Sequence, residues 1–438
     1  MQPQFLEKNF TFLFAFGLLI GLFFSFLYAN HQILTGDQFQ MLEKGYLGAY
    51  KGVWQSYGNA ASAVGNVPGL LSALVVGIPL MFWDSPWAPM VLLIALHLAS
   101  FLLFNAVIKQ IFNLTIQLIF LFLYWLNPWF LFENVIYNPS YLFFFTALHF
   151  WSAYHMREDK SFGYTILHLL SIAMAMQLHY SWIILAMISL YLYVRGIIKI
   201  NWFAVIAAFF ITALSLIPYF QAYLSHPEIR QNPGNKDHAR YIGWGLVHVY
   251  PIFKGIIYWF RYPSFLFSNT LSMYTNFDWL TSHPMMQKTV QYTYKGMIEI
   301  IGIASLWIVW KANYYSWKSI KPIAFRRSVS DYSQQQWLSM YALGAFIAIL
   351  ISGALSPIVF NYWHVIITFG VSLLPIIILI DSYISKDSKH VIKYLFIIIL
   401  YFGLINLIAA NDSKKYSYKA DYSQQARQFV YQKFSNAH

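Results

Sequence analysis

The stretch FTFLFAFGLLIGLFFSFLYA, residues 10–29, decides the class of this fold. It is an uninterrupted apolar run of about twenty residues, which as an α-helix crosses a hydrocarbon layer of about 30 Å. A secretory signal peptide has a shorter apolar region and ends in a small-x-small cleavage site, which Leu27 and Ala29 do not form. We therefore expect residues 10–29 to be the first membrane span.

The composition agrees with a membrane protein. Of the 438 residues, 59% are hydrophobic, 20% aromatic and only 10% charged, too few charged residues for a soluble domain. The net charge of +12 comes from basic residues scattered between apolar runs, which indicates membrane topology and disfavours nucleic-acid binding. Cysteine is absent, so the chain has neither disulfides nor thiolate metal ligands. The fold class predicted is an all-α polytopic integral membrane protein.

Further apolar runs predict the other spans, about eleven in all counting the first. The segment Val67–Trp83 is ambiguous, because it is barely long enough to span and contains Gly77 and two prolines, so a re-entrant or interfacial helix is the alternative. The remaining predicted spans are Trp87–Ile108, Ile111–Leu126, Asn138–Met156, Phe162–Leu178, Trp182–Val194, Trp202–Phe220, Met297–Trp310, Trp337–Leu355, Trp363–Ile380 and Val391–Ala410.

The distribution of lysine and arginine sets the orientation. If Val67–Trp83 does not cross, every short loop on one side is basic, as the positive-inside rule requires of cytoplasmic loops. The N-terminus is then inside and the C-terminus outside. We expect one membrane domain, residues 1–410, with outer loops at 30–86 and 221–295 and a short outer tail, 411–438. Within the second loop, Tyr241–Phe267 is aromatic and interrupted by charges and prolines, which predicts interfacial helices.

Acidic residues are rare, so those at the outer membrane edge are informative about chemistry. Asp37 follows Gly36 just beyond the first span, where a carboxylate could take a proton from a hydroxyl or amine acceptor. The alternative is that Asp37 only caps a juxtamembrane helix. Glu43 lies six residues further on and is either structural or a second catalytic candidate.

The order of several short motifs resembles the GT-C superfamily of polyprenyl-phosphate-sugar-dependent glycosyltransferases, which contains protein O-mannosyltransferases and aminoarabinose lipid A transferases. The resemblance covers most of the first 220 residues, and no single motif in it is specific. The motifs are GD at 36–37, VPGLL at 67–71, LNP at 126–128, YNPS at 137–140, QLHYS at 177–181 and IPYF at 217–220.

This resemblance implies the GT-C fold and an inverting sugar transfer on the extracytoplasmic face of a bacterial inner membrane, with Asp37 as general base. The donor would be a polyprenyl-phosphate sugar and the acceptor an envelope glycolipid, polysaccharide or protein. The chain also departs from the family. Asn138 stands where an acidic residue often opens the fourth span, the nearest acid being Glu133, and Tyr362-Trp363-His364 stands where an Arg-Tyr pair is frequent.

A lipid-linked donor carries phosphate, which arginine and lysine bind best. Arg240, Lys254 and Arg261 are the favoured candidates, and Lys254 and Arg261 are seven residues apart, hence on one face of a helix. Each could equally be a residue that snorkels toward lipid headgroups. His179, at the outer end of a span, is either a ligand to donor or acceptor, or a buried structural histidine.

Other functions and cofactors fit the sequence less well. No spacing of histidines or acids predicts a metal site or another cofactor, although one acid with diphosphate oxygens would suffice to hold a divalent ion. A secondary transporter would show inverted repeats and charges within its spans, which this sequence lacks. A ligase or polymerase of lipid-linked glycans would share the multispan plan and differ in its donor. A non-catalytic membrane scaffold is the remaining alternative.

Overall fold

The structure is a computed structural model of the 438-residue chain. It describes residues 3–32, 34–61, 65–227, 229, 249–266, 275–326, 331–356, 358, 360–384, 388–412 and 421–434. Arg240, one of the candidate phosphate ligands, lies outside these residues.

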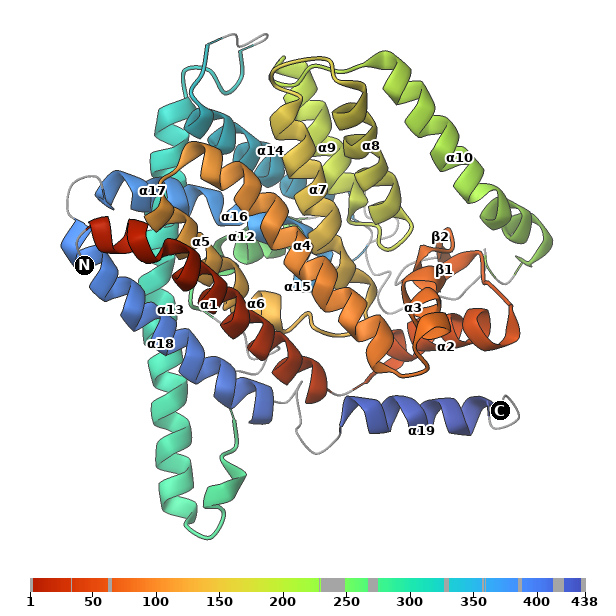
Figure 1. Cartoon of the computed structure of the whole chain (residues 1–438), viewed down its shortest axis with the longest axis horizontal. Helices are drawn as coiled ribbons and strands as arrows, with labels where there is room; N and C mark the ends of the chain where they lie inside the picture. The colour runs from red at the N-terminus through yellow and green to blue at the C-terminus, as the bar shows by residue number, and fades with distance from the viewer. Residues whose placement is uncertain are drawn as a thin grey trace.

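Helices make up most of the described chain, in the arrangement of Figure 1. The α-helices are α1 Pro3–Asn30, α2 Gly36–Lys51, α3 Leu71–Phe82, α4 Trp87–Ile111, α5 Leu114–Trp125, α6 Pro128–Leu131, α7 Leu142–His155, α8 Phe162–Met176, α9 Trp182–Val194, α10 Trp202–Ser225, α12 Val249–Arg261, α13 Pro284–Ile320, α14 Gln334–Leu355, α15 Tyr362–Val365, α16 Phe369–Ser372, α17 Leu374–Ile384, α18 Ser388–Asp412 and α19 Tyr422–Phe434. Short 3₁₀ helices are η1 Asn138–Tyr141, η2 Asp278–Leu280 and η3 Ile366–Thr368, and the antiparallel strands β1 Tyr57–Ala60 and β2 Asn66–Pro68 pair with each other.

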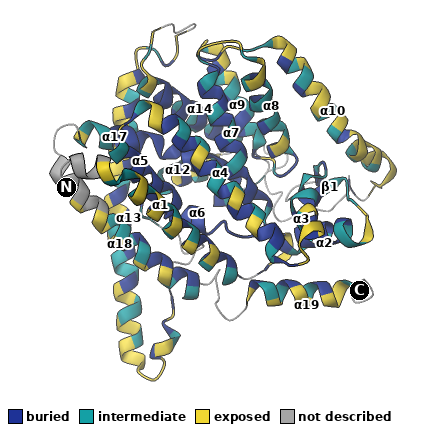
Figure 2. Cartoon of the chain, viewed as in Figure 1, coloured by how far each residue is buried: buried dark blue, intermediate teal, exposed yellow. Residues whose placement is uncertain are grey.

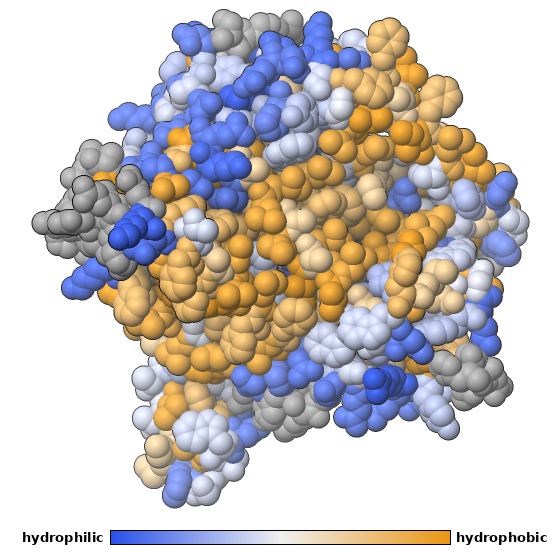
Figure 3. Space-filling view, in the orientation of Figure 1, coloured by the Kyte–Doolittle hydropathy of each residue, from blue (hydrophilic) through white to orange (hydrophobic). Residues whose placement is uncertain are grey.

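The protein is a helical membrane protein. Among the described residues, 6 helical segments are long and apolar enough to cross a bilayer: Lys8–Asn30, Trp87–Ile111, Trp202–Ser225, Pro284–Ile320, Gln334–Leu355 and Tyr362–Ile384. Hydrophobic side chains form a broad band across the face shown in Figure 3, with hydrophilic regions on both sides. Such a band is the surface expected to face lipid.

The observed helices match most of the predicted spans, and several of them differ from the predicted lengths. Helix α9 has the expected bounds, whereas α13 extends the predicted span Met297–Trp310 to 37 residues, about 55 Å of helix. Helices α5, α7 and α8 are 12, 14 and 15 residues long, shorter than a full crossing requires. The count of eleven spans therefore stays a prediction.

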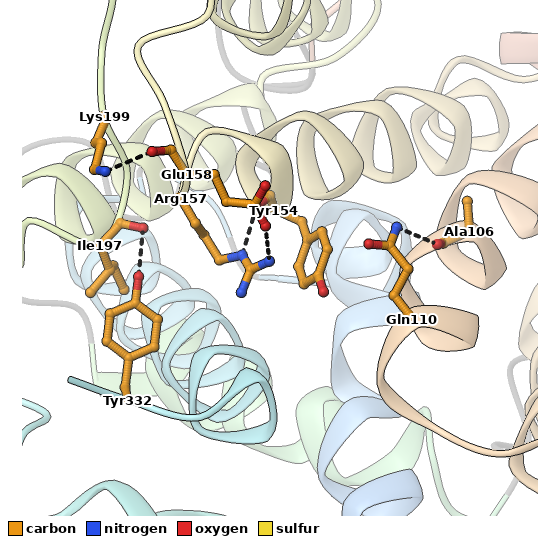
Figure 4. A network of polar contacts seen from close by, with 8 residues as sticks. All are labelled: Ala106, Gln110, Tyr154, Arg157, Glu158, Ile197, Lys199 and Tyr332. Atoms are coloured by element: carbon orange, nitrogen blue, oxygen red, sulfur yellow. Dashed lines mark hydrogen bonds and ion pairs between the residues drawn. The ribbon is translucent and has the colours of Figure 1, made fainter. Parts of the chain in front are cut away.

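The loop after α7, the loop after α9 and the start of α14 lie at the upper end of the molecule in Figure 1, and Figure 4 shows polar contacts among these segments from close by. Arg157 Nε donates to the Tyr154 carbonyl at 2.7 Å, and Lys199 Nζ donates to the Glu158 carbonyl at 2.7 Å. Tyr332 Oη donates to the Ile197 carbonyl at 3.4 Å. These bonds tie the loops after α7 and α9 to the segment before α14.

An aromatic core fills the centre of the molecule, where buried residues dominate (Figure 2). The Phe130 ring packs against Tyr124, Phe143 and Phe369, with ring centroids 4.8, 4.9 and 6.0 Å away. These side chains come from α5, α6, α7 and α16. Helices α5, α6, α7 and α16 thus meet in the interior of the molecule. The described chain is therefore divided into short helices near its centre.

The loop predicted to be the first outer loop folds into a compact unit of α2, the hairpin and α3. Helices α2 and α3 approach closely at Gly45, where an added Cβ would collide with the Val76 side chain. With 12 residues, α3 is about 18 Å long, short of the roughly 30 Å of a hydrocarbon core. The segment Val67–Trp83 therefore does not form a full-length span.

Helix α12 has one face packed against the helical core and one face exposed, and its position at the membrane interface stays a prediction. It runs antiparallel along α14, since Gly353 contacts Ile252 while Gly255 contacts Ile349. Trp259 is 2% exposed and Tyr262, just past its end, is fully buried. Tyr258, Trp259 and Tyr262 thus pack into the helical core, whereas Tyr250 and Phe253 on the same helix are exposed.

Candidate functional site

Asp37 lies in the first turn of α2 at the end of the molecule opposite the basic loops. Thr35 and Gln38 form a capping box that begins the helix, so capping does not require the Asp37 side chain. The Asp37 side chain is exposed, and its backbone carbonyl accepts a hydrogen bond of 2.9 Å from Asn59 Nδ2 on β1. The surrounding protein atoms nevertheless desolvate the carboxylate and raise its pKa above the ordinary aspartate value.

Tyr137 connects Asp37 with Glu133, the other acidic candidate in this region. The negative charges of both carboxylates act on the Tyr137 phenol and, after burial, are the causes that raise its pKa. Glu133 is fully buried, and its Oε2 accepts a hydrogen bond of 2.9 Å from Ser140 Oγ. An exposed and a buried carboxylate therefore both lie near one phenol.

Arg261 approaches the same region from α12. Its guanidinium carbon lies 5.4 Å from the centroid of the Trp129 ring, a cation–π contact. The charges of Glu133 and Arg261 both act on the Tyr262 phenol, whose Oη donates to the Tyr362 carbonyl at 2.5 Å. Asp37, Glu133 and Arg261 are thus brought into one region through Tyr137 and Tyr262.

A second polar group joins Asn138, His179 and His364. Asn138 Nδ2 donates to the Leu178 carbonyl at 2.8 Å, which fixes the orientation of the amide. Asn138 Oδ1 is then a buried acceptor for which the described residues supply no hydrogen-bond partner. The His179 and His364 rings lie 5.8 Å apart by their centroids, and Ser181 Oγ joins the His179 ring to the backbone carbonyl of His364.

The bonds of Ser181 assign the ring proton of His179, and a bond from Asn361 assigns that of His364. Its hydroxyl donates to the His364 carbonyl at 2.5 Å, so the 2.6 Å contact with His179 Nδ1 requires Nδ1 to donate. The Ser181 N–H also lies 3.2 Å from His179 Nδ1, a contact in which Nδ1 would have to accept. Because this contact is longer than the two made by the Ser181 hydroxyl, we place the ring proton of His179 on Nδ1. His364 Nδ1 accepts from the Asn361 N–H at 2.8 Å.

The two rings therefore offer different groups to a ligand. Burial lowers the pKa of His179 to about 4, so its ring is neutral near pH 7 with a lone pair on Nε2. His364, with Nδ1 used as acceptor, carries its proton on Nε2 when neutral. One acceptor and one donor at this spacing can bind a hydroxyl-bearing molecule.

Two other predicted residues lie apart from this cluster. Glu43 Oε2 forms an ion pair of 2.6 Å with Lys433 Nζ on α19. Six residues along α2 correspond to about 240° of rotation, so Glu43 and Asp37 leave the helix in different directions. Lys254 is half-buried on α12, with Nζ 5.6 Å from the Tyr250 ring centroid.

Sequence reasoning missed Asn59, Tyr137, Tyr262 and Ser181, which connect the predicted residues. Tyr137 opens the motif YNPS, directly before the predicted Asn138, and Ser181 ends the motif QLHYS. Their place in these motifs was a sequence signal that could have identified both residues. Asn59 and Tyr262 gave none, because asparagine and tyrosine are ordinary residues in polar loops and at membrane edges.

The chain also contains no group of three or more histidine or acidic side chains, within its described part, that could hold a metal ion. No protein-family model matches the sequence, and no curated protein matches it significantly.

Proposed function

We propose that the protein is an extracytoplasmic glycosyltransferase of GT-C type that uses a polyprenyl-phosphate-linked sugar. The observation that supports this most is Asp37: an exposed carboxylate in the helix that follows the apolar helix α1, with surroundings that raise its pKa. A general base works best when its pKa lies nearer the working pH than that of an ordinary aspartate. A lipid-linked donor would reach such a residue from the membrane, and an acceptor from the outer face.

In this proposal Asp37 takes the proton of an acceptor hydroxyl or amine as the acceptor attacks the anomeric carbon of the sugar. The bond from that carbon to the phosphate oxygen breaks on the opposite face, which inverts the configuration. Polyprenyl phosphate leaves with the bonding electron pair. The proton stays on the Asp37 carboxyl until water removes it.

The other residues receive supporting roles. Arg261 would bind the donor phosphate, because a guanidinium matches phosphate oxygens and its Trp129 contact already holds it in place. Lys254 would bind phosphate as a second cation. Asn138, His179 and His364 would bind sugar hydroxyls, and Glu133 would orient Arg261 and Tyr137.

The experiment compares envelope glycolipids and glycans by mass spectrometry in cells that lack the protein and cells complemented with variants. We expect a sugar-sized mass to disappear on deletion, to return with the wild type and to stay absent with Asp37→Asn. Asp84→Asn is the matched control, because Asp84 is also exposed on the first outer loop but bonds Tyr50. Full restoration by Asp37→Asn at normal expression would reject Asp37 as the base.

The finer topology belongs to the same proposal: about eleven spans, with Asp37 outside and the basic loops in the cytoplasm. Because the chain has no cysteine, single cysteines at Lys51 and Lys160, both exposed, can be labelled from one side at a time. A membrane-impermeant maleimide should label Lys51→Cys from outside and Lys160→Cys only after lysis. The reverse labelling pattern would show that the topology is the opposite of the one proposed.

One observation favours transport as a second candidate. Glu133 is a fully buried carboxylate in the segment where α5 and α6 end, and broken helices around buried charge occur in transporters. If deletion changes no glycan, uptake assays with Glu133→Gln decide between transport and a non-catalytic role.

A further inference from the structure

A cavity of about 270 Å³ lies between helices α12, α13, α14 and α17, apart from the residues of the candidate site. Aromatic and aliphatic side chains provide most of its wall. The lining residues are Trp259, Phe260, Asn313, Ser316, Trp317, Ile320, Ser339, Ala342, Leu343, Phe346 and Pro375.

One of the polar atoms in the cavity wall has no hydrogen-bond partner in the part of the chain that the structure describes. Ser339 is 2% exposed, and its Oγ has no hydrogen-bond partner among the described residues. Asn313 differs, because its amide oxygen accepts from Trp259 Nε1 at 3.0 Å and its nitrogen donates to the Val309 carbonyl at 2.9 Å. A buried hydroxyl without a partner costs free energy unless a ligand accepts from it.

The cavity lies toward the end of the molecule that carries the basic loops. Its α13 residues occupy the last two turns before Ile320, and Ser339 is in the second turn of α14. Gln336 Nε2 donates to the Ser319 carbonyl at 3.0 Å and closes this end of the α13–α14 pair. The lysines Lys318 and Lys321 are exposed just beside it.

Three lining side chains connect the cavity to the lipid-facing surface. Trp317, Leu343 and Phe346 are half-buried, on two helices that are long and apolar enough to span the membrane. Water is scarce at such a surface, so hydrocarbon is what can fill an apolar recess there.

We propose that this cavity binds one acyl chain of an anionic phospholipid from the leaflet next to the basic loops. The chain fills the aromatic recess, and Ser339 Oγ donates its proton to an ester carbonyl of the lipid. Lys318 and Lys321 bind the phosphate, as basic clusters at the ends of membrane helices do. The occupant is a resident lipid, and the proposal does not depend on the proposed enzymatic function.

The test uses the full chain in nanodiscs of phosphatidylcholine and phosphatidylglycerol, with lipids retained after mild detergent release counted by native mass spectrometry. Each lysine near a membrane surface contributes about fivefold to binding of an anionic lipid, so Lys318→Ala/Lys321→Ala should lower phosphatidylglycerol retention about 25-fold. The control pair Lys109→Ala/Lys160→Ala removes two exposed lysines at the same end, away from the cavity, and should retain phosphatidylglycerol as the wild type does.

A second variant separates the cavity from surface charge. Ser339→Leu places a larger side chain in the recess and removes the hydroxyl, and should reduce retention with all lysines present. Equal retention of both lipids by the wild type would overturn the proposal. So would an equal loss in the control pair, or undiminished phosphatidylglycerol binding by Ser339→Leu, since either result would indicate adsorption by charge alone.

Discussion

Helix α19 is expected to hold the chain segment that leads into Asp37, and Gln425 is the residue that tests this. Gln425 Nε2 donates to the Gln32 carbonyl at 2.9 Å, and its Oε1 accepts from the Leu34 N–H at 3.2 Å. Both partners are backbone groups between α1 and α2. The side chain thus binds the connection between the first span and the helix of Asp37.

The expected loss of docking free energy in Gln425→Ala follows from these two hydrogen bonds. A typical intramolecular hydrogen bond contributes about 1 kcal/mol net, so Gln425→Ala should weaken docking of α19 by about 2 kcal/mol. That corresponds to a roughly 25-fold larger population in which the segment is open. The Phe39–Phe429 stack, with ring centroids 4.6 Å apart, remains and keeps α19 nearby.

Amide hydrogen exchange in nanodiscs measures this opening directly. We expect exchange of amides 34–40 to rise about 25-fold in Gln425→Ala and to stay unchanged in Gln424→Ala. Gln424 is the matched control because it is the neighbouring residue of the same type with an exposed side chain. If both variants exchange like the wild type, α19 does not hold this segment and the reasoning fails.

Two further predictions concern the first outer loop. If Asp37 is the proposed base, transfer activity should fall on acidification at a higher pH than the roughly 3.9 of an ordinary aspartate, because a base must be ionised to act and the pKa of Asp37 is raised; a pH profile of kcat/KM with its acid limb at or below that value would contradict the assignment. Gly45→Ala should lower the free energy of unfolding by about 1–3 kcal/mol, since a Cβ there meets Val76 and the Gly77 backbone. Gly296→Ala, in open space on α13, should raise it by up to about 1 kcal/mol, and identical thermal melts of the two variants would argue against the α2–α3 contact.

The sequence predicted helices wherever hydrophobicity alone decides the structure. Trp182–Val194 was found with its expected bounds, and Trp202–Phe220 was extended to Ser225. It did not predict the full α13, because the polar turns from Pro284 onward are helical without being apolar. The hairpin was also missed, since strands of 4 and 3 residues are too short to show an alternating pattern.

The candidate site was predicted as separate residues and not as an arrangement. Asp37, Glu133 and Arg261 were each named from charge and position, and the structure brings them near Tyr137 and Tyr262. Those contacts join segments far apart in the chain, which local pattern cannot place. Glu43 shows the same limit: its ion pair with Lys433 depends on where α19 docks.

The docking of α19 also has a consequence for biogenesis. Gln425 is 393 residues downstream of Gln32, so the ribosome makes it roughly 20 to 80 seconds later at ordinary elongation rates. During that interval α2 has already been made, but α19, which holds the segment that leads into α2, has not. A nascent chain stalled before α19 should therefore expose Asp37 on an incompletely anchored helix, and maturation of this region must follow the insertion of the later helices.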